Sequence, residues 1–136
     1  MKTYKGLLTK LPSNGIFVFG SNTQGRHGAG NALAAKKYFG AIYGQSQGLQ
    51  GKSYGIITKD LTKSTHPSVS KEFIIEQIKL LYEFAIKNPN LDFYVAYSVT
   101  GTLLSGFNIN ELANMFNQQF IPTNIIFEEN FQKLIN

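Results

Sequence analysis

A glycine-rich stretch near the start of the chain holds the residues best suited to bind an anion. Arg26, the only arginine of the sequence, lies beside His27 between Gly25 and Gly28, and Gly30 follows closely. An arginine donates two parallel hydrogen bonds to a phosphate or a carboxylate, and glycines let the backbone approach such a group. These residue types predict a phosphate site. The alternative is an exposed turn in which the arginine is merely solvated.

The segments on either side predict the strand, loop and helix that such a site needs. Residues 16–19 are aromatic or β-branched and lie between glycines, as in a strand buried on both faces. A helix is predicted to begin near Ala29, so that its free N–H groups and the positive end of its dipole face the loop. The spacing matches neither the P-loop motif nor the Gly-x-Gly-x-x-Gly dinucleotide fingerprint, which disfavours both classes.

Composition limits the class of protein further. The chain has 136 residues, enough for a single domain over residues 1–136 with a proper core. It has no cysteine, which excludes disulfides and thiol catalysis, and its two histidines give no metal-ligand spacing. We therefore predict no metal and no cofactor. No Gly-x-Ser-x-Gly elbow supports a serine triad. Neither a secretory signal nor a membrane span is found, and we expect a cytoplasmic location.

Positive charge is concentrated in the first half of the chain. The formal net charge is +5, and residues 1–60 hold eight basic residues and one acid, whereas residues 61–136 hold five lysines and seven acids. The basic half also holds most of the glycines, which favours an anionic ligand, either a nucleotide or a nucleic-acid backbone. Because the lysines are scattered, nucleic acid is not the favoured partner.

The other elements alternate between strands and helices. After a leading strand or arm over residues 1–10, we predict strands at 16–19, 53–58, 93–97 and 124–127, a long loop at 40–51, helices at 29–39, 69–87 and 108–116, and a terminal turn or helix at 131–135. Asn108 and Glu111 have the spacing of a capping box at the start of the third helix. Such alternation predicts an α/β protein with a mostly parallel mixed sheet between helices and right-handed crossovers.

Three loops follow strands of this sheet, at residues 20–30, 58–66 and 98–107. Ligands of open α/β sheets bind outside the carboxyl ends of the strands, which is where these loops are expected. The first and third loops are rich in Gly, Ser and Thr. Facing each other, they would supply a diphosphate with backbone N–H donors from two sides.

These two loops resemble the ligand-binding loops of macrodomains. Gly20-Ser-Asn22 with Gly28-Ala-Gly-Asn-Ala32 resembles the first macrodomain loop, and Thr100-Gly-Thr-Leu-Leu-Ser-Gly-Phe107 resembles the second, which wraps a diphosphate. Over residues 12–127, the amino-acid sequence is similar to that of a divergent macrodomain-like group found in phage and bacterial genomes. The segments Tyr43-Gly-Gln45 and Thr58-Lys-Asp60 are part of this similarity. The resemblance implies a three-layer α/β/α sandwich that binds ADP-ribose or a related nucleotide.

The resemblance also implies roles for individual residues. Asn22 would hydrogen-bond the distal ribose, and the second loop would close over the phosphates. The implied ligand-binding set consists of Gly20, Ser21, Asn22, Arg26, Gly28, Ala29, Gly30, Asn31, Thr100, Gly101, Thr102, Leu103, Leu104, Ser105, Gly106 and Phe107. Two features depart from the family pattern. No acidic residue precedes the first loop to hold the adenine amino group, so adenine specificity is not implied. Arg26-His27 is also foreign to the usual loop.

Some macrodomains remove ADP-ribose from proteins or nucleic acids. The resemblance extends to one subgroup of them, whose mechanism uses a lysine and an aspartate. Lys59 and Asp60 would take those parts if desolvation or a cationic neighbour such as Arg26 makes the lysine nucleophilic. His27 would act as a general acid or base, or would only donate a hydrogen bond to a phosphate. The alternative is a surface lysine beside an aspartate that caps a turn. An ADP-ribosylated substrate is then the expected partner. Three other functions stay open: nucleotide binding without catalysis, a phage or host structural protein that retains the fold, and nucleic-acid binding.

Overall fold

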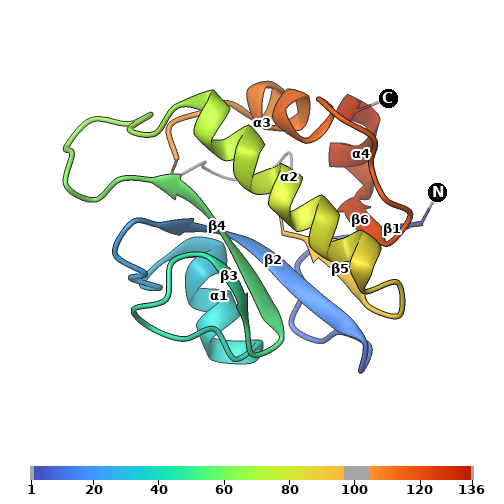
Figure 1. Cartoon of the computed structure of the whole chain (residues 1–136). Coiled ribbons are helices and arrows are strands. Elements are labelled where there is room, and N and C mark those ends of the chain that lie inside the picture. The colour runs from blue at the N-terminus through green and yellow to red at the C-terminus, as the bar shows by residue number, and fades with distance from the viewer. Residues whose placement is uncertain (1, 97–104, 136) are drawn as a thin grey trace.

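The chain folds as an α/β protein around one mixed, mostly parallel sheet. The structure is a computed structural model that describes residues 2–96 and 105–135. In these ranges the elements are β1 (Thr3–Tyr4), β2 (Gly15–Asn22), α1 (Gly30–Tyr38), β3 (Gly48–Gln50), β4 (Ser53–Lys59), α2 (Lys71–Lys87), β5 (Asp92–Val95), α3 (Ile109–Phe116), β6 (Ile125–Glu128) and α4 (Glu129–Ile135). The six strands lie in the order β1-β6-β5-β2-β4-β3 (Figure 1).

Strand β2 lies between β5 and β4 in the interior of the sheet. It pairs in parallel with β5 on one side and with β4 on the other, so that Val18 lies beside both Val95 and Tyr54. Only the edge pair β3 and β4 is antiparallel among the strands of the described ranges. The carboxyl ends of β2, β4 and β5 therefore meet at one edge, as the sequence predicted.

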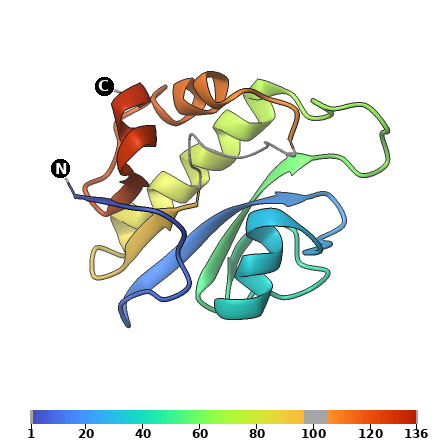
Figure 2. The ribbon, with the colours of Figure 1, turned by 180° about the vertical axis from the view of Figure 1, so that it is seen from behind.

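Helices cover both faces of the sheet. Phe17 and Phe19 pack with α1 on one face, while Ile16 and Val18 pack with α2, α3 and α4 on the other. Side chains alternate between faces along a strand, which is why consecutive residues of β2 belong to two cores. Figures 1 and 2, viewed from opposite sides, show α1 and α2 on opposite faces. Among the helices described, none is long and apolar enough to cross a membrane.

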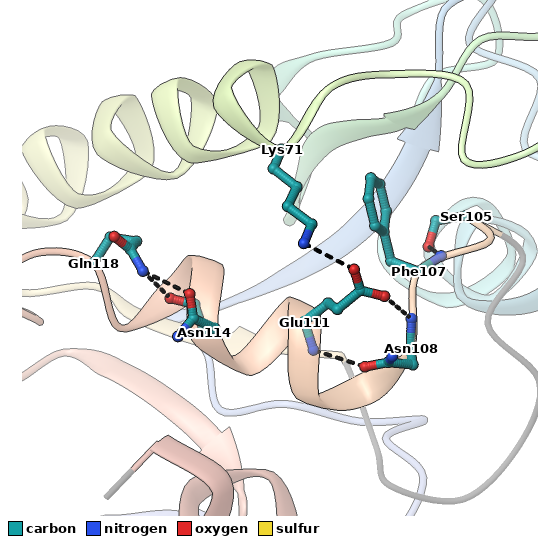
Figure 3. A network of polar contacts seen from close by, with 7 residues as sticks. All are labelled: Lys71, Ser105, Phe107, Asn108, Glu111, Asn114 and Gln118. Carbon is teal, nitrogen blue, oxygen red and sulfur yellow. Dashed lines mark hydrogen bonds and ion pairs between the residues drawn. The ribbon is translucent and has the colours of Figure 1, made fainter.

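The start of α3 confirms the predicted capping box. The Asn108 side chain accepts a hydrogen bond from the Glu111 backbone N–H at 2.9 Å, and the Glu111 carboxylate accepts one from the Asn108 N–H at 3.1 Å. The same carboxylate pairs with the Lys71 ammonium at 2.9 Å, which ties the start of α3 to the start of α2 (Figure 3). These contacts hold the pKa of Glu111 below its usual value, and the hydrogen bond from Lys71 has the largest effect.

The structure corrects several predicted boundaries. The predicted loop 40–51 contains the edge strand β3, whose sequence has no strand pattern of its own. Pairing with β4 and the buried Gln50 side chain hold it, since Gln50 accepts a hydrogen bond from the Ile42 N–H at 2.8 Å. Strand β2 runs through Gly20–Asn22, which were predicted as loop, because β4 continues beside them. The leading arm contributes β1, which pairs in parallel with β6.

Candidate functional site

A cavity of about 650 Å³ lies at the carboxyl ends of β2, β4 and β5, beside α1. Its size is within the range of roughly 300–1,000 Å³ that is usual for small-molecule sites. The predicted site residues that line it are Gly20, Ser21, Asn22, Arg26, Gly28, Ala29, Gly30, Asn31, Lys59 and Ser105. The fold thus brings together residues from the first predicted loop, the end of β4 and the segment before α3.

The first turn of α1 opens onto this cavity. Its N-cap residue Ala29 is extended, with φ −154° and ψ 160°, and no side chain of the described residues caps the helix. Residues 28–31 all line the cavity, and the Asn31 side chain donates a hydrogen bond to the Ala96 carbonyl just after β5. The first N–H groups of a helix have no intrahelical partner, and the dipole adds partial positive charge. This end of the cavity therefore suits an anion.

The charged side chains that line the cavity are both cationic. They belong to Arg26 and Lys59, and no Asp or Glu of the described part of the chain joins them. Neither cation forms an ion pair with a residue in residues 2–96 or 105–135. A cleft lined by one sign of charge attracts ligands of the opposite sign.

Ser21 adds a hydroxyl whose hydrogen-bonding capacity is unused. Its side chain is buried on the α1 side of β2, and its Oγ has no hydrogen-bond partner in the part of the protein that the structure describes. The Ser21 carbonyl, by contrast, accepts a hydrogen bond from the Thr58 hydroxyl at 3.3 Å. A buried hydroxyl without a partner costs free energy. A ligand oxygen that reached this Oγ would remove that cost.

Asn22 uses most of its side-chain amide to shape the loop. Its Oδ1 accepts hydrogen bonds from the backbone N–H groups of Arg26 at 2.9 Å and Gln24 at 3.3 Å, and its Nδ2 donates to the Arg26 carbonyl at 2.7 Å. One amide hydrogen is left for a ligand. Asn22 therefore places Arg26 beside the cavity, and its contact with a distal ribose stays a prediction.

His27 lies behind the loop and does not line the cavity. Its side chain is almost fully buried, and its Nε2 donates to the Ile42 carbonyl at 2.9 Å and to Gln50 Oε1 at 3.2 Å. Close by, Gly25 has φ +64°, and a Cβ there would stand 2.5 Å from the carbonyl carbon of Gly44. These contacts fasten the site loop to residues 42–50. The structure does not bring the His27 ring together with Arg26 and Lys59.

The pair predicted for catalysis is divided. Lys59 lines the cavity, but Asp60 does not. The Asp60 carboxylate accepts hydrogen bonds from the Thr62 hydroxyl at 2.6 Å, the Thr62 N–H at 2.9 Å and the Thr23 hydroxyl at 3.3 Å. These hydrogen bonds hold the pKa of Asp60 below its usual value. The bond from the Thr62 hydroxyl has the largest effect, and the bond from the Thr62 N–H the next largest. This is the geometry of a turn cap, the alternative that the sequence left open for Asp60.

The second predicted loop is only partly described. Thr100, Gly101, Thr102, Leu103 and Leu104 lie outside the described residues. Ser105 lines the cavity, whereas Gly106 and Phe107 do not. Gly106 has φ +85° and lies against the backbone of His66, where a Cβ would stand 2.5 Å from the carbonyl carbon. Phe107 is buried in the core between the sheet, α2 and α3.

One wall of the cavity was not predicted from the sequence. It is formed by the N-terminal segment, from which Tyr4, Gly6, Leu7, Leu8 and Thr9 line the cavity, together with Ala34 and Tyr38 of α1. The adjacent leucines in a polar arm were the available signal. Nothing local showed that this arm would lie opposite α1, because that placement depends on the pairing of β1 with β6.

Comparison with known proteins adds no family. No protein-family model matches the chain, and no curated protein matches its sequence. Within the described ranges, no group of three or more His, Cys, Asp or Glu side chains could hold a metal ion. The chemistry of the cavity therefore carries the functional inference.

Proposed function

We propose that this protein binds ADP-ribose or a related nucleotide in the cavity beside α1, with the diphosphate at the N-terminus of that helix. One observation carries the proposal: an uncapped helix N-terminus, Arg26 and Lys59 meet in a cavity of about 650 Å³ whose described lining holds no carboxylate. The Ser21 hydroxyl, which has no hydrogen-bond partner among the described residues, lies buried at the cavity wall and would donate to the diphosphate where the bound ligand reaches it. Donors and positive charge of this kind are what a diphosphate requires.

The proposal includes a macrodomain-like fold. Two findings support it: α1 lies on the opposite face of the sheet from the other helices, and the loop that resembles the first macrodomain loop lines the cavity. The likeness to macrodomains rests on the sequence of the two loops, of which the second lies largely outside the described residues.

Hydrolysis of an ADP-ribosyl bond is a separate claim. Of the three residues predicted to act in it, only Lys59 lines the cavity, while Asp60 caps a turn and His27 holds the loop from behind. The lysine/aspartate mechanism that the resemblance implies would need both side chains at the reacting sugar. We therefore propose binding as the function, and hydrolysis stays a prediction from the resemblance.

Calorimetric titration with ADP-ribose tests the proposal, with AMP and NAD as comparison ligands. We expect micromolar binding by the wild type. Arg26→Gln should weaken it by about tenfold or more, since hydrogen bonds to charged groups contribute roughly 1.5–3 kcal/mol. Lys79→Gln is the matched control, because Lys79 is an exposed cation of α2 that does not line the cavity. No heat from ADP-ribose, at protein concentrations well above micromolar, contradicts the proposal.

Two serine variants sharpen this test. Ser21→Ala removes a hydroxyl that has no protein partner in the described ranges, so its stability should not fall, while its affinity for ADP-ribose should drop about fivefold. Ser53→Ala is the control, because the Ser53 hydroxyl is also buried on a strand but donates to the Phe39 carbonyl at 2.9 Å, away from the cavity. That variant should lose stability and keep its affinity.

A further inference from the structure

The cavity does not end at the anion-binding turn. Its lining continues along α1 as far as Tyr38, past Ala34, and includes Leu7 and Leu8 of the N-terminal segment. The nine residues of α1 span about 13 Å at about 1.5 Å per residue. Figure 2 shows the N-terminal segment (dark blue) and α1 (cyan) on the same side of the sheet. The cavity lining therefore reaches from the cationic loop to the last residue of α1.

The two ends of this cavity differ in chemistry. The cations Arg26 and Lys59 come from the loops at the strand ends, whereas Leu7, Leu8, Ala34 and Tyr38 offer apolar surface. Leu7 is 90% exposed and Tyr38 is 47% exposed, so both have apolar area that a bound group can remove from water. An inorganic phosphate or a sugar phosphate would leave this half of the cavity unfilled.

The N-terminal wall is held in place before any ligand arrives. The Tyr4 hydroxyl donates to the Val95 carbonyl at 2.5 Å, and β1 pairs with β6. The Lys2 ammonium pairs with the carboxylate of Asp92, at the start of β5, at 3.3 Å. Leu8 packs against the core on the α1 side of the sheet, whereas the neighbouring Leu7 has no such cover. The segment is therefore anchored on both sides of an exposed leucine.

From this arrangement we infer that the N-terminal segment and the C-terminal half of α1 form the seat of the nucleotide base, with the base between Leu7 and Tyr38. The inference rests on the proposed function, because the anion-binding turn fixes the direction of the ligand. The Tyr38 ring has the Lys37 ammonium 5.4 Å from its centre and contacts the Phe39 ring at a centroid distance of 6.2 Å. Since Tyr38 is still 47% exposed, it keeps surface on which a base can stack. Apolar contact and stacking, which every base can make, hold the base in this seat.

Titration with ADP-ribose and with ribose 5-phosphate tests the inference, because the second ligand has a sugar and a phosphate but no base. Leu7→Ser and Tyr38→Ala should each weaken ADP-ribose binding by about fivefold, as expected for partial burial of one large apolar side chain. Neither variant should alter binding of ribose 5-phosphate. Leu80→Ser is the matched control, since Leu80 is an exposed leucine of α2 that does not line the cavity.

A second measurement reads the seat directly. The methyl resonances of Leu7 and Leu8 should shift on addition of ADP-ribose, through the ring current of the base, and should not shift with ribose 5-phosphate. Wild-type affinity for ADP-ribose in both Leu7→Ser and Tyr38→Ala, with unshifted methyl resonances, would overturn this inference and leave the proposed function intact. Absence of ADP-ribose binding by the wild type would overturn the proposed function, and this inference with it.

Discussion

At the scale of single residues, the site loop depends on the Asn22 amide. Its three hydrogen bonds to the backbone of Gln24 and Arg26 close the turn that places Arg26 at the cavity. Asn22→Ala should therefore lower the free energy of unfolding by about 1–2 kcal/mol and weaken ADP-ribose binding as well. Urea unfolding and calorimetry measure the two effects. Asn22→Asp, which keeps the acceptors but loses the donor to Arg26, should fall between wild type and alanine.

The Asp60 carboxylate gives a prediction about pH. Because the Thr62 hydroxyl holds the pKa of Asp60 below its usual value, the carboxylate stabilises the turn above the ordinary aspartate pKa. That contribution is lost as the pH falls through the lowered pKa of the folded state. Thr62→Val should raise the pKa of Asp60 toward its usual value, which a carboxyl-carbon NMR titration measures. An unchanged pKa would show that the remaining donors, the Thr62 N–H and the Thr23 hydroxyl, suffice.

At the scale of elements, the N-termini of α1 and α3 differ in their capping, and this difference bears on function. Helix α3 has a full capping box, whereas the described side chains leave α1 uncapped. Asn108→Ala should thus lower the free energy of unfolding by about 1 kcal/mol, as measured by urea unfolding. Glu111→Leu removes both the reciprocal cap and the ion pair with Lys71, and should cost at least as much. A neutral effect of Asn108→Ala would mean that packing alone holds the start of α3.

Because the start of α1 is uncapped, we expect a substitution that caps it to raise the stability of the fold and to weaken ADP-ribose binding. Ala29 is exposed and has the extended backbone of an N-cap residue. Ala29→Asp should raise the free energy of unfolding by about 0.5–1 kcal/mol, since aspartate caps a helix well. The same carboxylate would occupy the N–H groups assigned to the ligand and repel a diphosphate, so ADP-ribose binding should be lost. Ala29→Ser, a neutral cap, should lose less affinity for ADP-ribose. If Ala29→Asp instead raised both the free energy of unfolding and the affinity, the anion would not bind at this helix N-terminus.

At the scale of the whole molecule, a ligand that binds only the folded state must stabilise it. At a free ADP-ribose concentration of about 100 times its Kd, the free energy of unfolding should rise by about 2.7 kcal/mol. Urea unfolding with and without the nucleotide measures this change. In Arg26→Gln the same rise should require a correspondingly higher concentration of ADP-ribose. Equal stabilisation of both proteins at equal concentrations would show that the ligand does not use Arg26.

Much of the fold could be predicted because its elements carry local signals. Three patterns each predict an element from a few neighbouring residues. They are the apolar run in β2, the amphipathic pattern of α2 and the capping box of α3. Strand β3 and the end of β2 could not be predicted in the same way. Apart from Leu49, their residues are Gly, Gln, Ser and Asn, and a strand forms there because β4 supplies hydrogen-bonding partners.

The same division holds for the site. The sequence alone determined that a glycine-rich loop with a single arginine leads into a helix, because residue types and spacing within one loop suffice for that. Only the tertiary structure decided that Lys59 joins Arg26 at the cavity, that Asp60 and His27 turn to other partners, and that the N-terminal segment forms the far wall. Such contacts join residues distant in the sequence, and long-range strand pairing rather than local propensity determines which of them meet.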